Sequence, residues 1–290
     1  MKDVKALFYR LTIDSATEFL FGESIDSQLS NIPGYMPPNH RPIADEKDFA
    51  SAFDRVQSQV SDSILLGDLY WLVQTKEFKE NCKRCHAFID LYVHRALSKE
   101  KTREATTTSA GKQKFVFLDA LAESNRDPVE LRDQLLNVLL AGRDTTASLF
   151  SFHFMTLSRR PDIFAKLRAT VLEHFGTFTN PRNMTFEALK NCNYLQWAIN
   201  ETLRLYPSVP FNQRHALKDT CIPVGGGPDG TKPVYVKKGV NVDYSVYMIH
   251  RRKDLWGEDA DEFRPERWDG RRTGWEYLPF NGGPRICIGQ

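Results

Sequence analysis

The sequence predicts a mainly α-helical fold with a minor β-sheet region near the C-terminal part of the chain. Helical periodicity runs through most of the 290 residues, and one long helix has strong signals at both ends. An alternating pattern replaces this periodicity around residues 234–244. The length and the 41% hydrophobic content are typical of a globular protein with a sizeable core.

The first part of the chain is expected to be helical, with two interruptions. We predict a helix over residues 1–30, a proline-rich loop over 31–43, and helical structure again from about 48 to 97. Residues 98–114 are polar and have no large apolar groups. That composition predicts a mobile connector.

The next helix is the best-defined element of the sequence. Asp127 is a good N-cap, Pro128 suits the first helical position, Glu130 completes a capping box, and Pro161 stops the helix. About 32 residues at 1.5 Å each give a helix of roughly 48 Å. Its centre, residues 135–141, is apolar nearly all round, so we expect it to be buried.

The last part of the chain combines helices with a short sheet. Helices are predicted over residues 162–175 and 185–205. Beyond them, alternating residues predict a small hairpin about the turn 237–239, formed by Val234, Val236, Val240, Val242 and Tyr244. The final thirty or so residues are expected to be irregular.

Composition excludes several classes of function. The net charge of +2 gives no electrostatic support for nucleic-acid binding. Five cysteines, an odd number in a long chain, argue against a disulfide framework and favour a reducing compartment. No run approaches the roughly 18 apolar residues that a membrane-spanning helix needs.

One cysteine near the end of the chain lies in a glycine-rich segment, residues 280–289. Cys287 follows Arg285 by two residues, and the glycines around it are Gly282, Gly283 and Gly289. Glycines allow backbone N–H groups and a flat ligand to approach the sulfur closely. A thiolate held in this way suits haem iron, and Arg285 suits a negative group such as a haem propionate. The alternative is a buried cysteine in a turn.

A second segment with chemical potential, residues 141–146, lies in the middle of the long helix. Gly142 costs roughly 1 kcal/mol relative to alanine there, and Asp144 and Thr145 compete for backbone hydrogen bonds. A kink or widened turn at a binding site would explain such a sequence. A hydroxyl and a carboxylate in an apolar site can relay protons to a ligand. The alternative is a helix kink with satisfied polar groups.

These segments resemble the cytochrome P450 haem-thiolate monooxygenases. The cysteine-loop pattern of that family, Phe-x-x-Gly-x-Arg-x-Cys-x-Gly, is matched by Phe280, Gly283, Arg285, Cys287 and Gly289. Residues 141–146 match the oxygen-activation pattern Ala/Gly-Gly-x-Asp/Glu-Thr-Thr/Ser. The resemblance implies that Cys287 is the iron ligand of haem b and that Phe280, Gly283 and Arg285 contact this cofactor. It also implies that Thr145 holds and protonates dioxygen while Asp144 supplies protons from solvent.

A Glu-x-x-Arg pair at Glu201 and Arg204 is, taken alone, most simply an exposed ion pair on a helix. The P450 family uses such a pair with a later arginine, here Arg267, as a buried structural clamp. Removal of one member would leave the others buried without a partner. The resemblance also places Arg214 as a second base for a haem propionate, and the alternative for Arg214 and the adjacent His215 is plain surface charge.

The resemblance extends to substrate and partners. It implies an apolar pocket lined by Leu136, Leu140, Ala141, Val209 and Phe211. Residues 205–210 and 225–230 resemble the fungal branch that hydroxylates alkanes and fatty acids at or near the terminus. The implied partners are O2 and NADPH-cytochrome P450 reductase, docking near Arg271, Arg272 and Arg285. The implied location is the cytosolic face of the endoplasmic reticulum membrane, through an N-terminal anchor absent from this chain.

We expect residues 1–290 to form a single partial domain that is incomplete at both ends, because the family has further segments before and after them. One alternative is therefore a truncated, catalytically inactive helical fragment that retains no haem. Another is a haem-thiolate protein that rearranges peroxides, against which the intact Asp144-Thr145 pair counts.

Residues 82–86, Cys-Lys-Arg-Cys-His, match the Cys-x-x-Cys-His pattern of covalent haem attachment. Cys82 and Cys85 also continue a helical apolar face with Phe78, Ile89 and Tyr92. We interpret them as ordinary packed cysteines, and a zinc site lacks a nearby fourth ligand.

Overall fold

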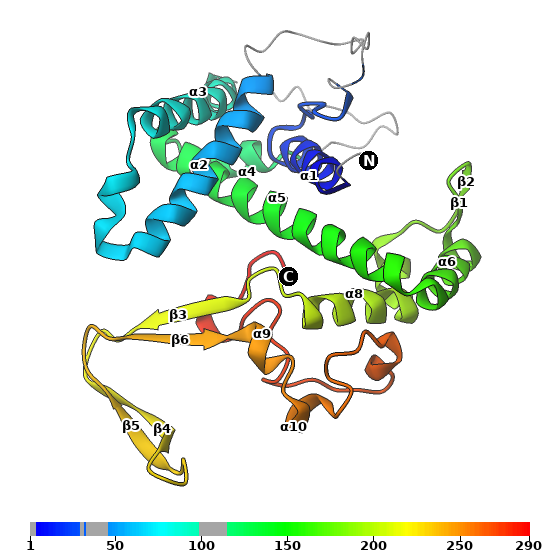
Figure 1. The fold of residues 1–290 in the computed structure, drawn as a ribbon. Helices are drawn as coiled ribbons and strands as arrows, with labels where there is room; N and C mark the ends of the chain where they lie inside the picture. Colours follow the sequence, from blue (N-terminus) through cyan, green and yellow to red (C-terminus); the bar gives the residue numbers. More distant parts are fainter. Residues whose placement is uncertain (1–3, 30–31, 33–45, 99–114) are drawn as a thin grey trace. The chain divides into compact units, whose positions relative to one another are not determined.

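The computed structural model describes residues 4–29, 32, 46–98 and 115–290, and it confirms a mainly helical fold with small antiparallel sheets (Figure 1). The predicted proline-rich loop, apart from Ile32, and the polar connector beyond Ser98 lie outside the described residues. The chain divides into two compact units, Met1–Ala147 and Ser148–Gln290, each of which is considered by itself. The single domain predicted over 1–290 stays a prediction.

The first helix, α1 (Val4–Phe21), is shorter than the 1–30 predicted. Gly22 ends it with a φ of +81°, a conformation that side chains resist, and its Cα lies so close to Val116 that an added Cβ would be 2.9 Å from Val116 Cγ2. The chain then turns back along the helix. There the Asp14 carboxylate accepts the backbone N–H groups of Ser27 at 2.7 Å and Gln28 at 3.2 Å.

The helical region predicted from 48 to 97 is two helices that pack against each other, α2 (Glu46–Leu66) and α3 (Lys76–Ser98). A 3₁₀ segment, η2 (Gly67–Val73), joins them. Gly67 starts the reversal with a φ of +52°, and Thr75 Oγ1 accepts the N–H of Phe78 at 3.1 Å as a cap of α3. Periodicity alone does not reveal this break, because both helices continue the same kind of pattern.

The core of the first unit is built by α1, α2, α3, α4 (Phe117–Ser124) and the first turns of α5 (Pro128–Arg159). Stacked aromatic rings join the helices, with centroids 4.0 Å apart for Phe49 and Phe88 and 4.2 Å for Phe21 and Tyr92. Cys85 is part of this core at 3% exposure, and burial raises the pKa of its thiol to about 12. Cys82 is half-buried. Both thiols therefore favour the protonated form, as expected for packing residues.

The predicted start of α5 is confirmed. Asp127 Oδ1 accepts the N–H groups of Val129 at 2.8 Å and Glu130 at 3.2 Å, while the N–H of Asp127 itself donates to Asn125. In a capping box the Glu130 side chain would accept the backbone N–H of Asp127, but here the Asn125 side chain accepts it. The all-round burial predicted for 135–141 is wrong, since Leu135 and Leu139 are buried but Leu140 is 42% exposed.

The second unit begins in α5 and continues with α6 (Pro161–Phe175), α7 (Phe186–Asn191) and α8 (Asn193–Leu205). The helix predicted over 185–205 is thus broken at Cys192, a buried residue with non-helical angles. The apolar core here joins α5, α6 and α8 through Leu157, Ile163, Leu167, Tyr194, Ala198 and Leu205. A two-residue pair of strands, β1 (Gly176–Thr177) and β2 (Asn180–Pro181), precedes α7.

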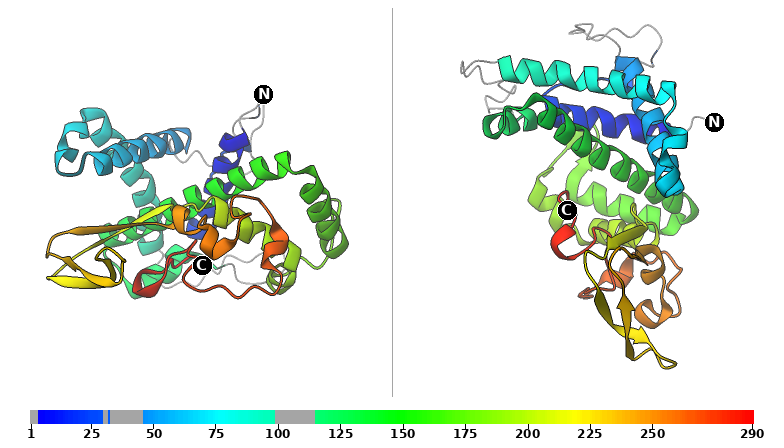
Figure 2. Two further views of the ribbon diagram at one scale, coloured as in Figure 1. Left: turned by 60° about the horizontal axis from the view of Figure 1, so that its bottom comes forward. Right: turned by 90° about the vertical axis from the view of Figure 1, so that its left-hand side faces the viewer.

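The predicted hairpin about residues 237–239 is wrong in its pairing. Strand β5 (Lys232–Val236) pairs with β4 (Thr220–Gly226), and β6 (Asn241–Ser245) pairs with β3 (Phe211–His215). Figure 2 shows the two ribbons from two further sides. The turn joins separate sheets because Gly239 donates its N–H to Ala216, at the end of β3, and the Lys238 N–H donates to Asp219.

The final thirty or so residues are largely irregular, as predicted, and so are the ten or so residues before them. The chain after β6 contains the short helices α9 (Val246–Ile249) and α10 (Lys253–Trp256), followed by two 3₁₀ turns, η3 (Pro265–Trp268) and η4 (Gly283–Arg285). Within the described ranges, no helix combines the length and the apolar character needed to cross a bilayer.

Candidate functional site

The cysteine loop, residues 280–289, is shaped by its own backbone. The N–H of Cys287 donates to the carbonyl of Phe280 at 2.9 Å, and the N–H of Ile286 donates to that of Gly283 at 3.1 Å. Gly283 has a φ of +73°, which favours glycine at this position. The loop is thereby closed on itself, with the cysteine at one end of it.

The sulfur of Cys287 is open to approach. Cys287 is exposed and Ile288 is fully exposed, and a Cβ added to Gly289 would lie 3.8 Å from Sγ. Gly282 packs directly against the Trp275 side chain, and a Cβ added there would lie 2.6 Å from it. A thiolate donor with an unobstructed, partly apolar rim fits a flat iron-containing cofactor.

The base of the loop is attached to the rest of the second unit at several points. Asn281 donates to Asn212 Oδ1 on β3 at 3.0 Å and accepts from Tyr244 OH on β6 at 2.8 Å. Tyr277 OH donates to the Asn200 carbonyl on α8 at 3.2 Å. These contacts hold the segment before the loop to both the sheet and a helix.

The two arginines predicted to bind cofactor propionates, Arg285 and Arg214, are both exposed. Arg214 lies on β3, where its Nη1 donates to the Gln213 carbonyl at 2.9 Å and its guanidinium lies 5.4 Å from the Tyr244 ring. Their propionate role stays a prediction.

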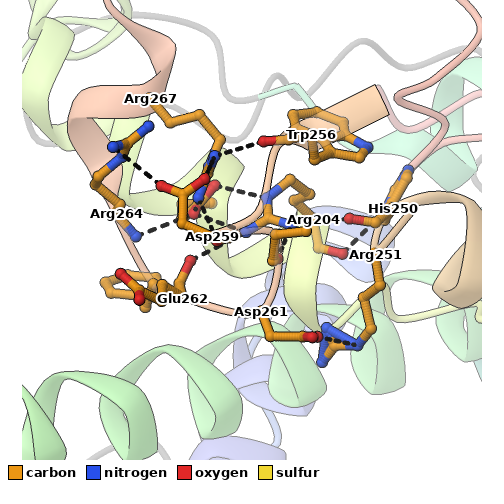
Figure 3. A network of polar contacts seen from close by, with 12 residues as sticks. Arg204, His250, Arg251, Trp256, Asp259, Asp261, Glu262, Arg264 and Arg267 are labelled. Carbon is orange, nitrogen blue, oxygen red and sulfur yellow. Dashed lines mark hydrogen bonds and ion pairs between the residues drawn. The ribbon is translucent and has the colours of Figure 1, made fainter. Parts of the chain in front are cut away.

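The second unit also contains a buried ion network formed by Glu201 and Arg204 of α8 and Arg267 of η3. We call these three residues the Glu201 network. Figure 3 shows this region, with Arg204 and Arg267 labelled. Both side chains of the α8 pair are fully buried, and Arg267 is 7% exposed as a residue. Arg204 binds the carboxylate through two bonds, Nε to Oε2 at 2.9 Å and Nη2 to Oε1 at 2.8 Å. Arg267 Nε adds a bond to Oε1 at 3.2 Å.

The remaining donors of both guanidinium groups bind backbone carbonyls of the irregular segment. Arg204 Nη1 donates to His250 at 2.8 Å and Ala260 at 2.6 Å, and its Nη2 also donates to Glu262 at 3.1 Å. Arg267 donates to the carbonyls of Trp256 and Asp259. The network therefore supplies hydrogen-bond donors to backbone carbonyls in a segment that has few hydrogen bonds of regular secondary structure.

Charge balance in the network involves a fourth residue, Asp259, whose Oδ1 accepts from Arg267 Nη1 at 2.9 Å. This bond holds the pKa of Asp259 below its usual range. Burial opposes the charge on Arg267, but the bonds to Asp259 and the charge of Glu201 outweigh burial and raise its pKa. Asp259 Oδ2 also lies 3.0 Å from Arg264 Nη1, so the two carboxylates face three guanidinium groups.

Three residues of this region were not found from the sequence. Trp268 Nε1 donates to Glu201 Oε2 at 3.0 Å, and the backbone N–H of Arg264 donates to Oε1 at 3.0 Å. His250 accepts the backbone N–H of Leu278 at 2.8 Å. Trp268 and Arg264 are close to Arg267 in the sequence, but their bonds to Glu201 join residues more than sixty positions apart. His250 likewise bonds to a residue 28 positions later. No local sequence pattern predicts bonds over such distances.

The predicted relay residues lie on α5 in the first unit. Thr145 Oγ1 donates to the Ala141 carbonyl one turn earlier at 2.6 Å, and the helix stays α-helical throughout. The predicted widened turn is therefore wrong. Asp144 is half-buried, and burial raises the pKa of its carboxyl although Arg143 acts in the opposite direction.

Arg143, which sequence reasoning passed over, is the most buried charge beside Asp144. It is 3% exposed, lies 5.0 Å from the Tyr9 ring and 5.4 Å from the Phe53 ring, and binds Asp54 at 2.5 Å and Asp144 at 3.2 Å. The Asp144 carboxylate is thus oriented by its sequence neighbour.

The predicted pocket residues belong to both units. Leu140 and Ala141 are exposed and Leu136 is half-buried on α5. Ala141 lies one turn before Thr145 on the same side of the helix, whereas Leu136 and Leu140, one turn apart from each other, share a different side. Val209 is 43% exposed and Phe211 is 68% exposed in the second unit. The pocket that would join these two sets stays a prediction.

Comparison with known proteins places the chain in the class of haem-thiolate proteins known as cytochromes P450. The sequence model of the family described as Cytochrome P450 matches residues 1–290. The chain therefore belongs to the cytochrome P450 family.

Several fungal relatives are similar over 99% of this chain. It is 51% identical to Cytochrome P450 monooxygenase g430 of a Fusarium species, covering 50% of that protein. It is 49% identical to Cytochrome P450 52A10 of Candida maltosa, covering 55%, and 49% identical to Cytochrome P450 52A1 of Candida tropicalis, covering 53%. The chain thus spans about half the length of the curated relatives it matches.

Neutralising Glu201 is expected to destabilise the second unit strongly. Glu201→Gln leaves Arg204 and Arg267 buried without their shared counterion, so the free energy of unfolding should fall by about 3–5 kcal/mol. Denaturant unfolding measures this change. The matched control is Asp254→Asn, which breaks an exposed ion pair with Arg252 and should change stability by less than about 1 kcal/mol. Equal unfolding midpoints for the two variants would contradict the role of the network.

Proposed function

We propose that the protein is a haem-thiolate monooxygenase that inserts one oxygen atom of O2 into an apolar substrate. The observation that carries the proposal is the accessible sulfur of Cys287, held at the end of a closed glycine loop. Membership of the cytochrome P450 family supports it.

The cofactor in this proposal is haem b. Cys287 supplies the thiolate ligand, Phe280 and Gly283 border it, and Arg285 and Arg214 provide positive charge for the propionates. When bound, the haem supplies the activation of dioxygen, which electron donation from a thiolate favours.

Proton delivery in the proposal falls to two residues of α5. The Thr145 hydroxyl is held against the Ala141 carbonyl, which fixes the direction of Oγ1. Asp144 is the residue that passes protons towards it from solvent, and burial raises the pKa of its carboxyl. Arg143 keeps the carboxylate oriented.

The proposed substrate class is an n-alkane or fatty acid, hydroxylated at or near its terminus. Leu136, Leu140, Ala141, Val209 and Phe211 are the apolar residues assigned to its binding. The similarity of residues 205–210 and 225–230 to the fungal branch supports this class. In the structure, residues 225–230 comprise the end of β4 and the turn that leads to β5, and the Gly225 N–H donates to the Gly230 carbonyl at 2.7 Å.

The proposed electron donor is NADPH-cytochrome P450 reductase, docking near the cysteine loop. Arg272 and Arg285 are exposed, whereas Arg271 donates to the Leu255 carbonyl at 3.0 Å and lies 4.1 Å from the Trp256 ring. Arg272 and Arg285 are thus the better candidates for meeting acidic groups. The proposed location is the cytosolic face of the endoplasmic reticulum membrane, through an N-terminal anchor.

Replacing the proposed iron ligand is expected to abolish the haem-thiolate spectrum. In the intact protein, Cys287→Ser should remove the strongly red-shifted carbon monoxide band of the reduced form, because serine does not supply a thiolate. Cys221→Ser is the matched control, since Cys221 is also exposed and should leave the band unchanged. If Cys287→Ser kept the band, another ligand would hold the iron.

Removing the Thr145 hydroxyl is expected to uncouple electron use from product formation. Thr145→Ala should retain the haem but divert most reducing equivalents from NADPH to peroxide, because the variant lacks the hydroxyl that is proposed to donate the proton. Product formed per NADPH consumed, with Thr146→Ala as control, measures this effect. Full product yield from Thr145→Ala would show that the relay assignment is wrong.

A further inference from the structure

His250 is a fully buried histidine at the end of α9, and neither the sequence motifs nor the proposed mechanism uses it. Its ring lies among aromatic side chains, with the Tyr277 ring centroid at 5.2 Å and that of Trp256 at 6.3 Å. A polar ring in such surroundings needs partners for both of its nitrogens.

Both nitrogens have partners that fix the protonation state. Nδ1 lies 3.0 Å from the backbone carbonyl of Arg204, which only accepts, so Nδ1 carries the hydrogen. Nε2 accepts the backbone N–H of Leu278 at 2.8 Å, so Nε2 carries none. One neutral tautomer satisfies both bonds.

The surroundings of the ring favour this neutral form. Burial lowers the pKa of His250 to about 4, and the positive charges of Arg204 and Arg251 act in the same direction. A protonated ring would need a second acceptor where the Leu278 N–H now points. The ring therefore stays a donor on one side and an acceptor on the other near neutral pH.

The two hydrogen-bond partners of His250 connect it to the Glu201 network on one side and to the cysteine loop on the other. On one side, Arg204 is a member of the Glu201 network, and its Nη1 also donates to the His250 carbonyl at 2.8 Å. On the other side, Leu278 opens the segment that leads into the cysteine loop. Its carbonyl accepts the N–H of Asn281 at 3.1 Å, directly after Phe280, whose carbonyl holds the N–H of Cys287.

We propose that His250 is a positioning residue for Cys287, whose neutral ring joins the Glu201 network to the backbone at Leu278 and so fixes the start of the cysteine loop. The inference rests on the proposed role of Cys287 as the iron ligand. It assigns His250 an effect on the cysteine loop beyond its contribution to core packing.

A second histidine, His153, provides a matched control. It is 9% exposed, burial lowers its pKa to about 4 as well, and its Nδ1 lies 2.7 Å from Thr202 Oγ1 on α8, two residues before Arg204. Its bond ends on a side chain that bonds back to Ala198 of the same helix. Loss of His153 therefore removes a comparable buried contact without touching the cysteine loop.

The experiment compares His250→Phe with His153→Phe in the intact protein. Amide hydrogen exchange at Leu278, Asn281 and Cys287 is the first readout, and the fraction of reduced protein with the thiolate-type carbon monoxide band is the second. Both variants should lower the thermal midpoint. Only His250→Phe should speed exchange at these amides, by about tenfold or more, and lower the thiolate fraction.

Two conservative variants, His250→Gln and His250→Asn, each replace only one of the two hydrogen bonds of the ring. They also keep the proposal testable if His250→Phe does not fold. The glutamine oxygen of His250→Gln reaches the Nε2 position and can accept from Leu278, whereas the amide of His250→Asn reaches only the Nδ1 position. Exchange at Leu278 should stay near wild type in His250→Gln and rise in His250→Asn.

Equal exchange at Leu278 in the glutamine and asparagine variants, or equal effects of His250→Phe and His153→Phe, would overturn the proposal. If wild-type protein shows no thiolate-type band at all, the proposed function fails instead. The exchange measurements still decide the role of His250 in that case, because they do not depend on bound haem.

Discussion

The second unit depends on one buried carboxylate, that of Glu201. Burying a carboxylate without partners costs several kcal/mol, and the cost is offset only by good geometry and additional hydrogen bonds. Glu201 accepts from two atoms of Arg204, from Nε of Arg267, from the Trp268 indole and from the Arg264 backbone. Its partners come from α8 and from a segment more than sixty residues later, so the carboxylate joins parts of the chain that share no regular secondary structure.

The same network explains how an irregular segment can be buried. Residues 250–268 contain only short helical turns, so many of their carbonyl groups lack regular partners. Arg204 and Arg267 donate to carbonyls at His250, Trp256, Asp259, Ala260 and Glu262. Guanidinium groups thus replace a β-sheet or helix as the source of hydrogen bonds. In our account this rigid base, extended by His250, allows the cysteine loop to keep its sulfur exposed and still in place.

Short local signals were sufficient for part of the fold and of the site. The cap at Asp127, the long helix after it and the cysteine loop follow from residues within a few positions of one another. Features that depend on distant partners were missed or wrong. Strands β5 and β6 pair with earlier strands and not with each other, and Trp268 and His250 bond to residues that periodicity does not bring together. Leu140 shows the same limit, because apolar character alone does not tell which side of a helix is covered.

The most direct test of this account is a double-mutant cycle on Glu201 and Arg267, in which denaturant unfolding is followed by tryptophan fluorescence, to which Trp256 and Trp268 contribute. The variants are Glu201→Gln, Arg267→Met and the pair together. If the carboxylate and the guanidinium stabilise each other in burial, the double variant should lose at least about 2 kcal/mol less than the sum of the single losses. Losses that add to within about 0.5 kcal/mol would contradict the account, because the two charges would then act independently.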